Sequence, residues 1–271
     1  MSLRKRMSGL ALECSRKVIS SFNGFCARYS KVGDHEVFDH RDFPWLPAIE
    51  ADWRKVRAEL DAILPYMAHM QNFHDVWGGN RKIKRVFADL PNYLTQGEGW
   101  KTYFFYGFGL KAPKNCRRCP ETVKLLKRIP GMKTAFFSIL GPHKYVPAHR
   151  GPFKGVLRLL LPLRIPEPAE KCGIRVGTHT RAWDEGKALV FDDTVRHEVW
   201  NHTDGVRVVL LVEVVRPMRF PANLVNAAVI WLIALSPFML GNAGSYLRWE
   251  RRFEAIVNAD EPARRRMAPD V

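Results

Sequence analysis

The feature of this sequence that most constrains the fold is a change of hydrophobic period at Lys133. From there to about residue 217, short apolar segments with a period of two recur between Gly, Pro, Asp and Thr turns. Such alternation is typical of half-buried strands, and the spacing of the segments predicts an antiparallel sandwich or barrel. The segments are KTAFFSIL, GVLRLLLPL, CGIRV, KALVFDD, HEVW and VRVVLLVEVV.

Before this region the apolar residues follow a helical period. The stretch AIEADWRKVRAELDAIL, within residues 34–65, predicts a core-packing helix, and Pro120 at the start of PETVKLLKRI predicts another over 120–129. Residues 8–29 predict an amphipathic helix with a basic side. Two interpretations of that helix stay open: it docks on the domain with a solvated polar face, or it lies on a membrane surface.

A second apolar stretch, LVNAAVIWLIALSPFML at residues 224–240, follows the predicted strands. Its length is close to the lower limit for crossing a bilayer. Both of its flanks are basic, and the positive-inside rule opposes placing either flank outside. We expect a re-entrant or interfacial segment on the cytoplasmic side, with a buried core helix as the alternative.

The chain is strongly basic, with 43 Lys and Arg against 27 Asp and Glu, a formal net charge of +16. Such a surplus points to an anionic partner: a nucleic acid, a membrane face or an acidic small molecule. The five cysteines form no regular framework, which predicts a reducing compartment. Cys116 and Cys119 lack the second pair that a structural zinc site needs, so a structural or disulfide-capable role is favoured.

Two histidines, His149 and His197, fall at predicted strand ends, where imidazoles could bind iron, zinc or copper. Arg158 and Arg207 interrupt apolar strands and suggest an anionic co-substrate, although alternation leaves open whether Arg158 points inward or to solvent. A non-haem Fe(II) oxygenase usually has a carboxylate two residues after the first histidine, and that position here is Gly151. Spacing alone therefore gives an incomplete iron site.

Five motifs between Ser138 and Pro217 together resemble the aspartyl/asparaginyl β-hydroxylase family. They are His-x-Gly-Pro at 149–152, Arg-x-Trp-x-x-Gly at 181–186, Phe-Asp-Asp at 191–193, His-Glu-Val-Trp at 197–200, and Arg207 ten residues after His197. The resemblance implies a dioxygenase that uses Fe(II), 2-oxoglutarate and O2 on a double-stranded β-helix. In this family two histidines bind iron and a glycine replaces the usual acid.

The resemblance assigns roles to six residues of this chain. His149 and His197 match the iron ligands, and Asp193 matches a residue that holds an iron-bound water. The positions that contact 2-oxoglutarate are matched by Ser138, Arg158 and Arg207, with Arg207 binding the distal carboxylate. The chain departs from the peptide-hydroxylating members at Leu160 and Tyr145, where they have histidines, which weakens the transfer of a peptide substrate.

The flanking sequences resemble a different branch, the bacterial lipid A hydroxylases and the related ornithine-lipid hydroxylases. The matching stretches are NCRRCP at 115–120, RPMRFPANLVN at 216–226, LSPF at 235–238 and RWERRF at 248–253. This implies hydroxylation of an acyl chain of a membrane lipid, at C2 of a lipid A secondary chain or on an ornithine lipid. The alternatives are a protein or peptide Asp/Asn hydroxylase and a non-enzymatic jelly-roll binding module.

The sequence thus predicts an α+β protein in which N-terminal helices pack around a jelly-roll core. We expect a basic arm over 1–33, a dioxygenase domain over 34–217 with its jelly roll at about 133–217, and a membrane-associated segment with a basic tail over 218–271. The expected partners are a lipid substrate and an anionic membrane surface. A nucleic acid is not expected, because no binding motif accompanies the charge. The expected location is the cytoplasmic face of a bacterial inner membrane, with a cytoplasmic protein as the alternative.

Overall fold

The computed structural model describes residues 20–73 and 99–267. Most of the predicted basic arm, residues 1–19, lies outside the described residues, and its described part is helical over 20–29. The rest of the described chain forms two antiparallel sheets with helices on one side, so the α+β class is confirmed.

A seven-stranded sheet has the order β1-β2-β4-β11-β6-β9, with β3 beside β2, and a four-stranded sheet has the order β5-β10-β7-β8. The strands of the large sheet are β1 (Gln71–Asn72), β2 (Trp100–Gly107), β3 (Leu110–Lys111), β4 (Met132–Leu140), β6 (Val156–Arg164), β9 (Leu189–Phe191) and β11 (Arg207–Val215). Those of the small sheet are β5 (Tyr145–His149), β7 (Cys172–Val176), β8 (His179–Ala182) and β10 (His197–Asn201).

From β4 to β11 the chain passes back and forth between the sheets. Strands β4, β6, β9 and β11 belong to the large sheet, while β5, β7, β8 and β10 belong to the small one, and all pairs are antiparallel. This is the strand order of a double-stranded β-helix, as predicted.

The large sheet also extends beyond the predicted strands. β2 pairs with β4 along its length, although Trp100–Gly107 precedes the region of period two. Both faces of β2 are largely buried, and a bulge falls between Phe104 and Tyr106. A strand that is buried on both faces shows no polar alternation, so period alone could not reveal it.

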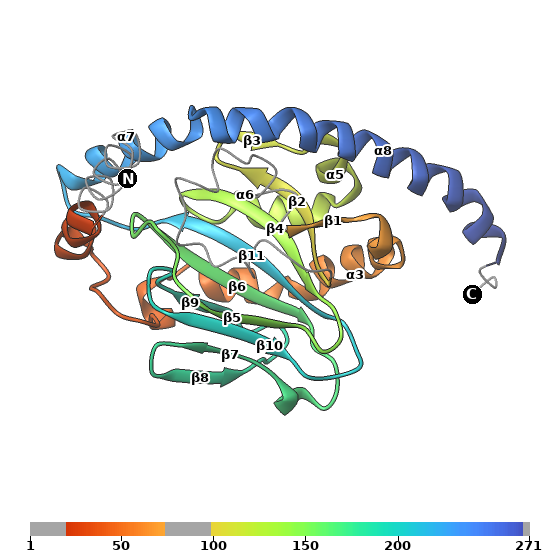
Figure 1. The fold of residues 1–271 in the computed structure, drawn as a ribbon, viewed down its shortest axis with the longest axis horizontal. Coiled ribbons are helices and arrows are strands. Elements are labelled where there is room, and N and C mark those ends of the chain that lie inside the picture. Colours follow the sequence, from red (N-terminus) through yellow and green to blue (C-terminus); the bar gives the residue numbers. More distant parts are fainter. Residues whose placement is uncertain (1–19, 74–98, 268–271) are drawn as a thin grey trace, which may run out of the picture.

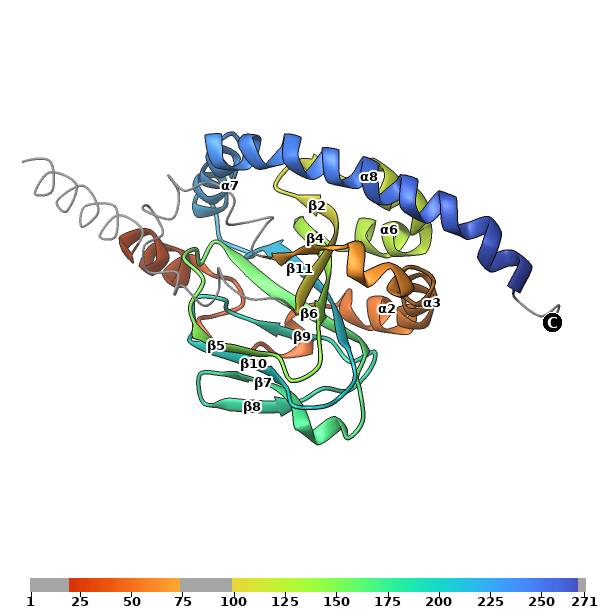
Figure 2. The ribbon, with the colours of Figure 1, turned by 45° about the vertical axis from the view of Figure 1, so that its right-hand side comes forward.

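Helices cover the face of the large sheet that is turned away from the small sheet (Figure 2). The stretch predicted as one helix forms α2 and α3, separated at Asp52. The helix that begins at Pro120 is confirmed as α6. The helices that precede β11 are α2 (Leu46–Ala51), α3 (Trp53–Ile63), α5 (Pro113–Arg118) and α6 (Pro120–Lys127), with 3-10 turns at His40–Asp42, Leu64–His69 and Ala169–Lys171.

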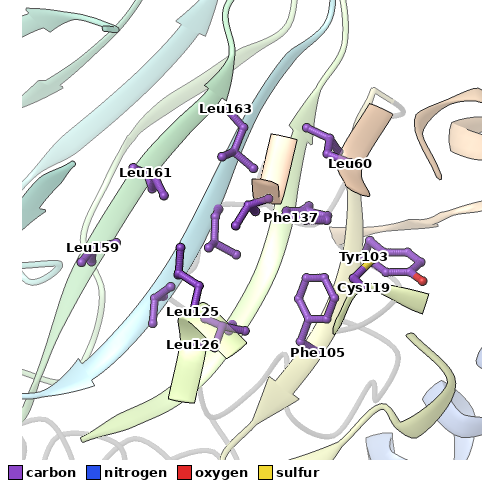
Figure 3. Close-up of a cluster of buried hydrophobic side chains, with 14 of the residues drawn as sticks. Leu60, Tyr103, Phe105, Cys119, Leu125, Leu126, Phe137, Leu159, Leu161 and Leu163 are labelled. Carbon is purple, nitrogen blue, oxygen red and sulfur yellow. The ribbon is translucent and has the colours of Figure 1, made fainter. Parts of the chain in front are cut away.

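The main core lies between these helices and the large sheet (Figure 3). Alternate residues of β6, among them Leu159, Leu161 and Leu163, pack there against α3 and α6. Cys116 and Cys119 belong to this cluster as free, buried thiols, and burial raises the pKa of both. A second cluster fills the space between the two sheets, and the candidate site lies on that side.

After β11 the chain forms α7 (Ala222–Ala234) and the long helix α8 (Pro237–Met267), which runs across one end of the sheet (Figure 1). α8 contributes the buried side chains of Phe253 and Val257 to the main core. α7 is not the buried core helix that the sequence left as an alternative, because most of its apolar side chains are exposed. No helix within 20–73 or 99–267 is long and apolar enough to cross a bilayer.

Candidate functional site

The two histidines singled out in the sequence lie directly opposite each other in the small sheet. His149 ends β5, His197 begins β10, and the register pairs them. Residues opposite each other in an antiparallel pair project from the same face. The two rings accordingly lie 4.1 Å apart between centroids and are tilted by 55°.

Hydrogen bonds fix how both rings are presented. The Nδ1 atom of His149 lies 2.8 Å from the carbonyl of Pro147, and that of His197 lies 2.8 Å from the carbonyl of Val195. A carbonyl can only accept, so Nδ1 carries the proton in each ring and Nε2 keeps its lone pair. The Nε2 atom of His197 is buried and has no hydrogen-bond partner among the described residues. Burial lowers the pKa of His149 to about 4, and the charge of a protonated His197 would lower it as well. Burial also lowers the pKa of His197.

The carboxylate of Asp193 occupies the space that a side chain at position 151 would need. A Cβ built on Gly151 would overlap the Oδ2 atom of Asp193 and lie 2.5 Å from its Cγ. The backbone N–H of Gly151 donates to the carbonyl of Asp193 at 2.7 Å. The Oδ1 atom of Asp193 lies 3.3 Å from the Nε2 atom of His197. An acid is therefore present beside the histidines, but it comes from the start of the β9–β10 loop.

Arg158 points inward and pairs with two acids, which resolves the question that alternation left open. Its Nη1 atom lies 2.7 Å from the Oδ1 atom of Asp193, and its Nη2 donates to Glu213 at 3.1 Å. Burial would lower the pKa of Arg158, but the two carboxylates outweigh it and raise the pKa. Arg158 thus holds Asp193 in place, and Glu213, which no sequence motif marked, completes the arrangement.

Arg207, at the start of β11, is buried without a carboxylate partner among the described residues. Its guanidinium carbon lies 5.1 Å from the ring centroid of Trp183, and its Nε is buried and unpartnered. Burial lowers the pKa of Arg207 to about 10, opposed by the nearby thiol of Cys172. A buried cation without a counter-ion is costly, which makes this position suited to an anionic ligand.

Ser138 lies on the same inner face, diagonally across from Arg207 in the β4–β11 pair. Its Oγ accepts a hydrogen bond of 3.0 Å from Trp100 on β2. The motif Arg-x-Trp-x-x-Gly contained Trp183 but gave no sign that its ring lies beside Arg207. Trp100 had no signal in the sequence, because β2 itself was not predicted.

The first acid of the Phe-Asp-Asp motif faces a different network. Asp192 pairs with Arg216 and with Lys154, whose Nζ lies 2.9 Å away. Both Asp192 and Arg216 have fully buried side chains. Burial would raise the pKa of Asp192, but Arg216 and Lys154 outweigh it and lower the pKa. Asp192 therefore anchors the loop that presents Asp193.

Across the described ranges, no group of three or more His, Cys, Asp or Glu side chains is arranged to hold a metal ion. The six residues predicted from the sequence do fall on the side of the large sheet that faces the small sheet. His149, His197, Asp193 and Arg158 form one connected group through the contacts above, whereas Ser138 and Arg207 lie on neighbouring inner-face positions of β4 and β11.

Comparison with known sequences decides the family. The sequence model of the aspartyl/asparaginyl β-hydroxylases matches residues 50–217. The chain belongs to this family. As a member of the aspartyl/asparaginyl β-hydroxylase family it is an enzyme of hydroxylase type, so the non-enzymatic alternative is not supported.

Relatives of this hydroxylase include proteins with different named substrates. An ornithine lipid ester-linked acyl 2-hydroxylase of Rhizobium tropici is 42% identical over 232 residues, 86% of this chain and 79% of that protein. The human aspartyl/asparaginyl β-hydroxylase is 30% identical over 181 residues, 65% of this chain but 22% of the human protein. A mouse aspartate β-hydroxylase domain-containing protein 2 is 28% identical over 229 residues, 79% of this chain and 63% of that protein.

Among solved structures, a cupin domain of a transcriptional regulator from Enterobacter cloacae superposes with a TM-score of 0.30 at 10% identity. It covers 43% of this chain and 96% of that domain. A likeness this distant adds nothing to the strand order described above.

Proposed function

We propose that this protein is an Fe(II)- and 2-oxoglutarate-dependent dioxygenase that hydroxylates an acyl chain of a membrane lipid. The observation that carries the proposal is the His149–His197 pair, with both Nδ1 atoms bound to carbonyls and the Nε2 of His197 buried without a partner. A metal ligand histidine has this arrangement, because a hydrogen bond at one ring nitrogen orients the other toward the metal.

The residues at this position fit iron. Imidazole is a good ligand for Fe(II), and pKa values lowered by burial keep both rings neutral near pH 7. The third ligand of the usual triad is absent at Gly151, and Asp193 stands in that space, held by Arg158. We expect His149 and His197 to bind the metal and Asp193 to accept a hydrogen bond from a water beside it. Bound Fe(II), with 2-oxoglutarate as the co-substrate, supplies the activation of O2 that is needed to hydroxylate an unactivated carbon.

Arg207 is the proposed partner of the distal carboxylate of 2-oxoglutarate. An arginine can bind a carboxylate through two parallel hydrogen bonds, and this one has no competing acid among the described residues. Trp183 restricts its position through the ring contact, and Ser138 offers a hydroxyl on the same face. Arg158 also remains a proposed contact of 2-oxoglutarate, although its pairing with Asp193 gives it a positioning role.

The lipid substrate rests on the similarity to the ornithine lipid hydroxylase, which extends over 86% of this chain. The four cysteines within the described ranges are free, which is in keeping with a reducing compartment. We therefore place the reaction at the cytoplasmic face of a bacterial inner membrane, with the protein bound peripherally. The match to the family of Asp/Asn hydroxylases supports the second candidate, hydroxylation of a protein or peptide.

The test is a reaction of the purified protein with Fe(II), 2-oxoglutarate and O2. Three substrates are offered separately: an ornithine lipid in detergent, lipid A in detergent, and a peptide containing Asp and Asn. Succinate is measured, and mass spectrometry locates any added oxygen. We expect one oxygen on an acyl chain, loss of turnover in His197→Ala, and unchanged turnover in the matched variant of the exposed His202, His202→Ala.

Oxygen found only on the peptide would replace the lipid proposal with the second candidate. Full turnover by His197→Ala would overturn the assignment of the metal site.

A further inference from the structure

The helix α7 has an apolar surface that faces solvent. The α7 ridge is defined here as four exposed residues of the helix and one beyond each of its ends: Leu224, Val225, Trp231 and Leu232, with Phe220 before it and Leu235 after it. Phe220 is 76% exposed, and Trp231 and Leu232 are each 62% exposed. Only one side of the helix, with Ala222, Asn226 and Ile230, is buried.

This exposure is not ordinary surface apolarity. A helix on the surface of a soluble protein normally turns charged side chains outward. Here no charged residue occurs between Arg219 and Arg248. Single exposed apolar residues need no explanation, whereas a contiguous group marks a surface that binds something.

Cations surround the first turn of α7. Arg219 lies next to Phe220, and its guanidinium donates to the carbonyl of Arg28 at 2.9 Å. The backbone of Lys31 donates to Pro217 at 2.8 Å, which brings a third cation to the same place. All three residues are exposed, and none of them forms a salt bridge with an acid of the described part of the chain. Apolar side chains bordered by cations that have no acidic partner complement a bilayer with anionic headgroups.

The α7 ridge is connected to the candidate site through the loop that follows His149. Asn226 of α7 donates to the carbonyl of Gly155 at 2.9 Å. From the helical residues 20–29, Asn23 donates to the carbonyl of Pro152 at 3.1 Å. It also accepts from the backbone of Lys154 at 2.9 Å. The two helices thus hold the middle and the C-terminal end of the loop that begins after the proposed iron ligand, and they lie together in the fold (Figure 1).

We propose that the α7 ridge docks the protein on an anionic bilayer, with Arg28, Lys31 and Arg219 against the headgroups and the loop after His149 on the membrane side. The proposal names the surface from which the enzyme takes its substrate, and in this respect it rests on the proposed function. Docking itself uses neither iron nor 2-oxoglutarate, so it is measured independently of turnover.

The first experiment measures the partition of the full-length protein into vesicles of phosphatidylcholine with and without phosphatidylglycerol. The test variant is Trp231→Ser/Leu232→Ser, and the control is Ile256→Ser, a 37% exposed apolar residue on α8. Because both sites are exposed, circular dichroism and the Tm should stay unchanged. We expect the test variant to lose at least about tenfold in partition, since two apolar anchors are removed. The control should partition like the wild type.

A second experiment places Trp231 in the bilayer directly. Lipids brominated on the acyl chains should quench the fluorescence of the wild type, and Trp231→Phe should lose most of this quenching while it still binds. The charge-removing variant Arg28→Gln/Lys31→Gln should weaken binding to the anionic vesicles and leave binding to phosphatidylcholine alone unchanged.

Three results would overturn the proposal. The first is equal vesicle binding by the wild type and Trp231→Ser/Leu232→Ser. The second is quenching that Trp231→Phe does not change. The third is dimer formation by the wild type that is lost in Trp231→Ser/Leu232→Ser. In that case the ridge would be an interface between two copies of the chain. Loss of docking by Trp231→Ser/Leu232→Ser with full turnover of detergent-solubilised lipid would support the proposal, because detergent removes the need for a bilayer contact. No turnover of any lipid by the wild type would overturn the proposed function and leave the docking result standing.

Discussion

The substitution Gly151→Ala tests whether the carboxylate of Asp193 fills the position of the missing third ligand. The added Cβ would lie 2.5 Å from the Cγ of Asp193, and ordinary carbon contacts are about 3.5 Å, so the carboxyl group must move by about 1 Å. That movement lengthens the 2.7 Å contact of Asp193 with Arg158. Overpacking a well-packed site costs about 1–3 kcal/mol, and weakening a buried ion pair adds to it.

We therefore expect Gly151→Ala to lower the free energy of unfolding by about 2–3 kcal/mol, measured by urea denaturation followed by circular dichroism. The control is Gly24→Ala, because Gly24 is helical and its added Cβ meets no atom within 4 Å. This variant should be about 0.5–1 kcal/mol more stable than the wild type.

The decisive comparison is made in a second background. In Asp193→Ala the carboxylate is gone and the added methyl group has room, so Gly151→Ala should then cost less than about 0.5 kcal/mol. An equal cost in both backgrounds would show that Asp193 does not occupy this space, and the argument for its place beside the histidines would fail.

Three further predictions follow from the buried charges. With Fe(II) and no O2, 2-oxoglutarate at about 100 times its dissociation constant should raise the Tm by about 5–10 °C, and Arg207→Leu should abolish this shift; a shift retained by the variant would contradict the anion site. Asp192→Asn should cost about 3–5 kcal/mol at pH 7 because Arg216 is left buried and unpaired. Because the pKa of Asp192 is lowered in the fold, the difference in stability between the wild type and Asp192→Asn should shrink as pH falls below 3.8. Urea denaturation at a series of pH values tests this, and a difference that stays constant with pH would refute it. Glu250→Gln should lower the free energy of unfolding by about 1–2 kcal/mol in the same assay. The reason is that the buried carboxylate of Glu250 accepts hydrogen bonds from the first N–H groups of α5 at 2.8 and 3.0 Å. A cost no larger than that of Glu254→Gln would contradict this.

Periodicity was sufficient for β4, β6, β7, β9, β10 and β11, whereas β5 and β8 were not among the predicted segments. A period of two assigns each residue to one of two faces, and the turns between segments set where strands end. His149 and His197 could therefore be placed at strand ends from the sequence. That they lie opposite each other depends on the pairing of β5 with β10, which period does not specify.

The polar partners could not be predicted, because they depend on contacts between distant segments. Arg158 and Glu213 are in contact because β6 pairs with β11. The place of Asp193 against Gly151 follows from two loops of different strands that approach each other. The pairing of Asp192 with Arg216 joins a residue of the Phe-Asp-Asp motif to the first residue of the RPMRFPANLVN stretch, and nothing in either stretch indicates that the two are in contact. Each depends on tertiary geometry that local patterns do not contain.

The apolar stretch at 224–240 shows a different limit. Composition and flanking charge argued against a crossing but could not separate an interfacial helix from a buried one. The distinction depends on how much surface the rest of the fold covers, and α7 is covered only along Ala222, Asn226 and Ile230.

The contacts of α8 with the rest of the fold fix the position of α7 relative to the candidate site. Glu250 binds the start of α5 and Phe253 lies in the main core, so α8 is a rigid mount for the helix before it. A bilayer docked on α7 as proposed would then lie at a fixed distance from the two histidines. That distance would limit which carbon of the proposed acyl substrate can reach them.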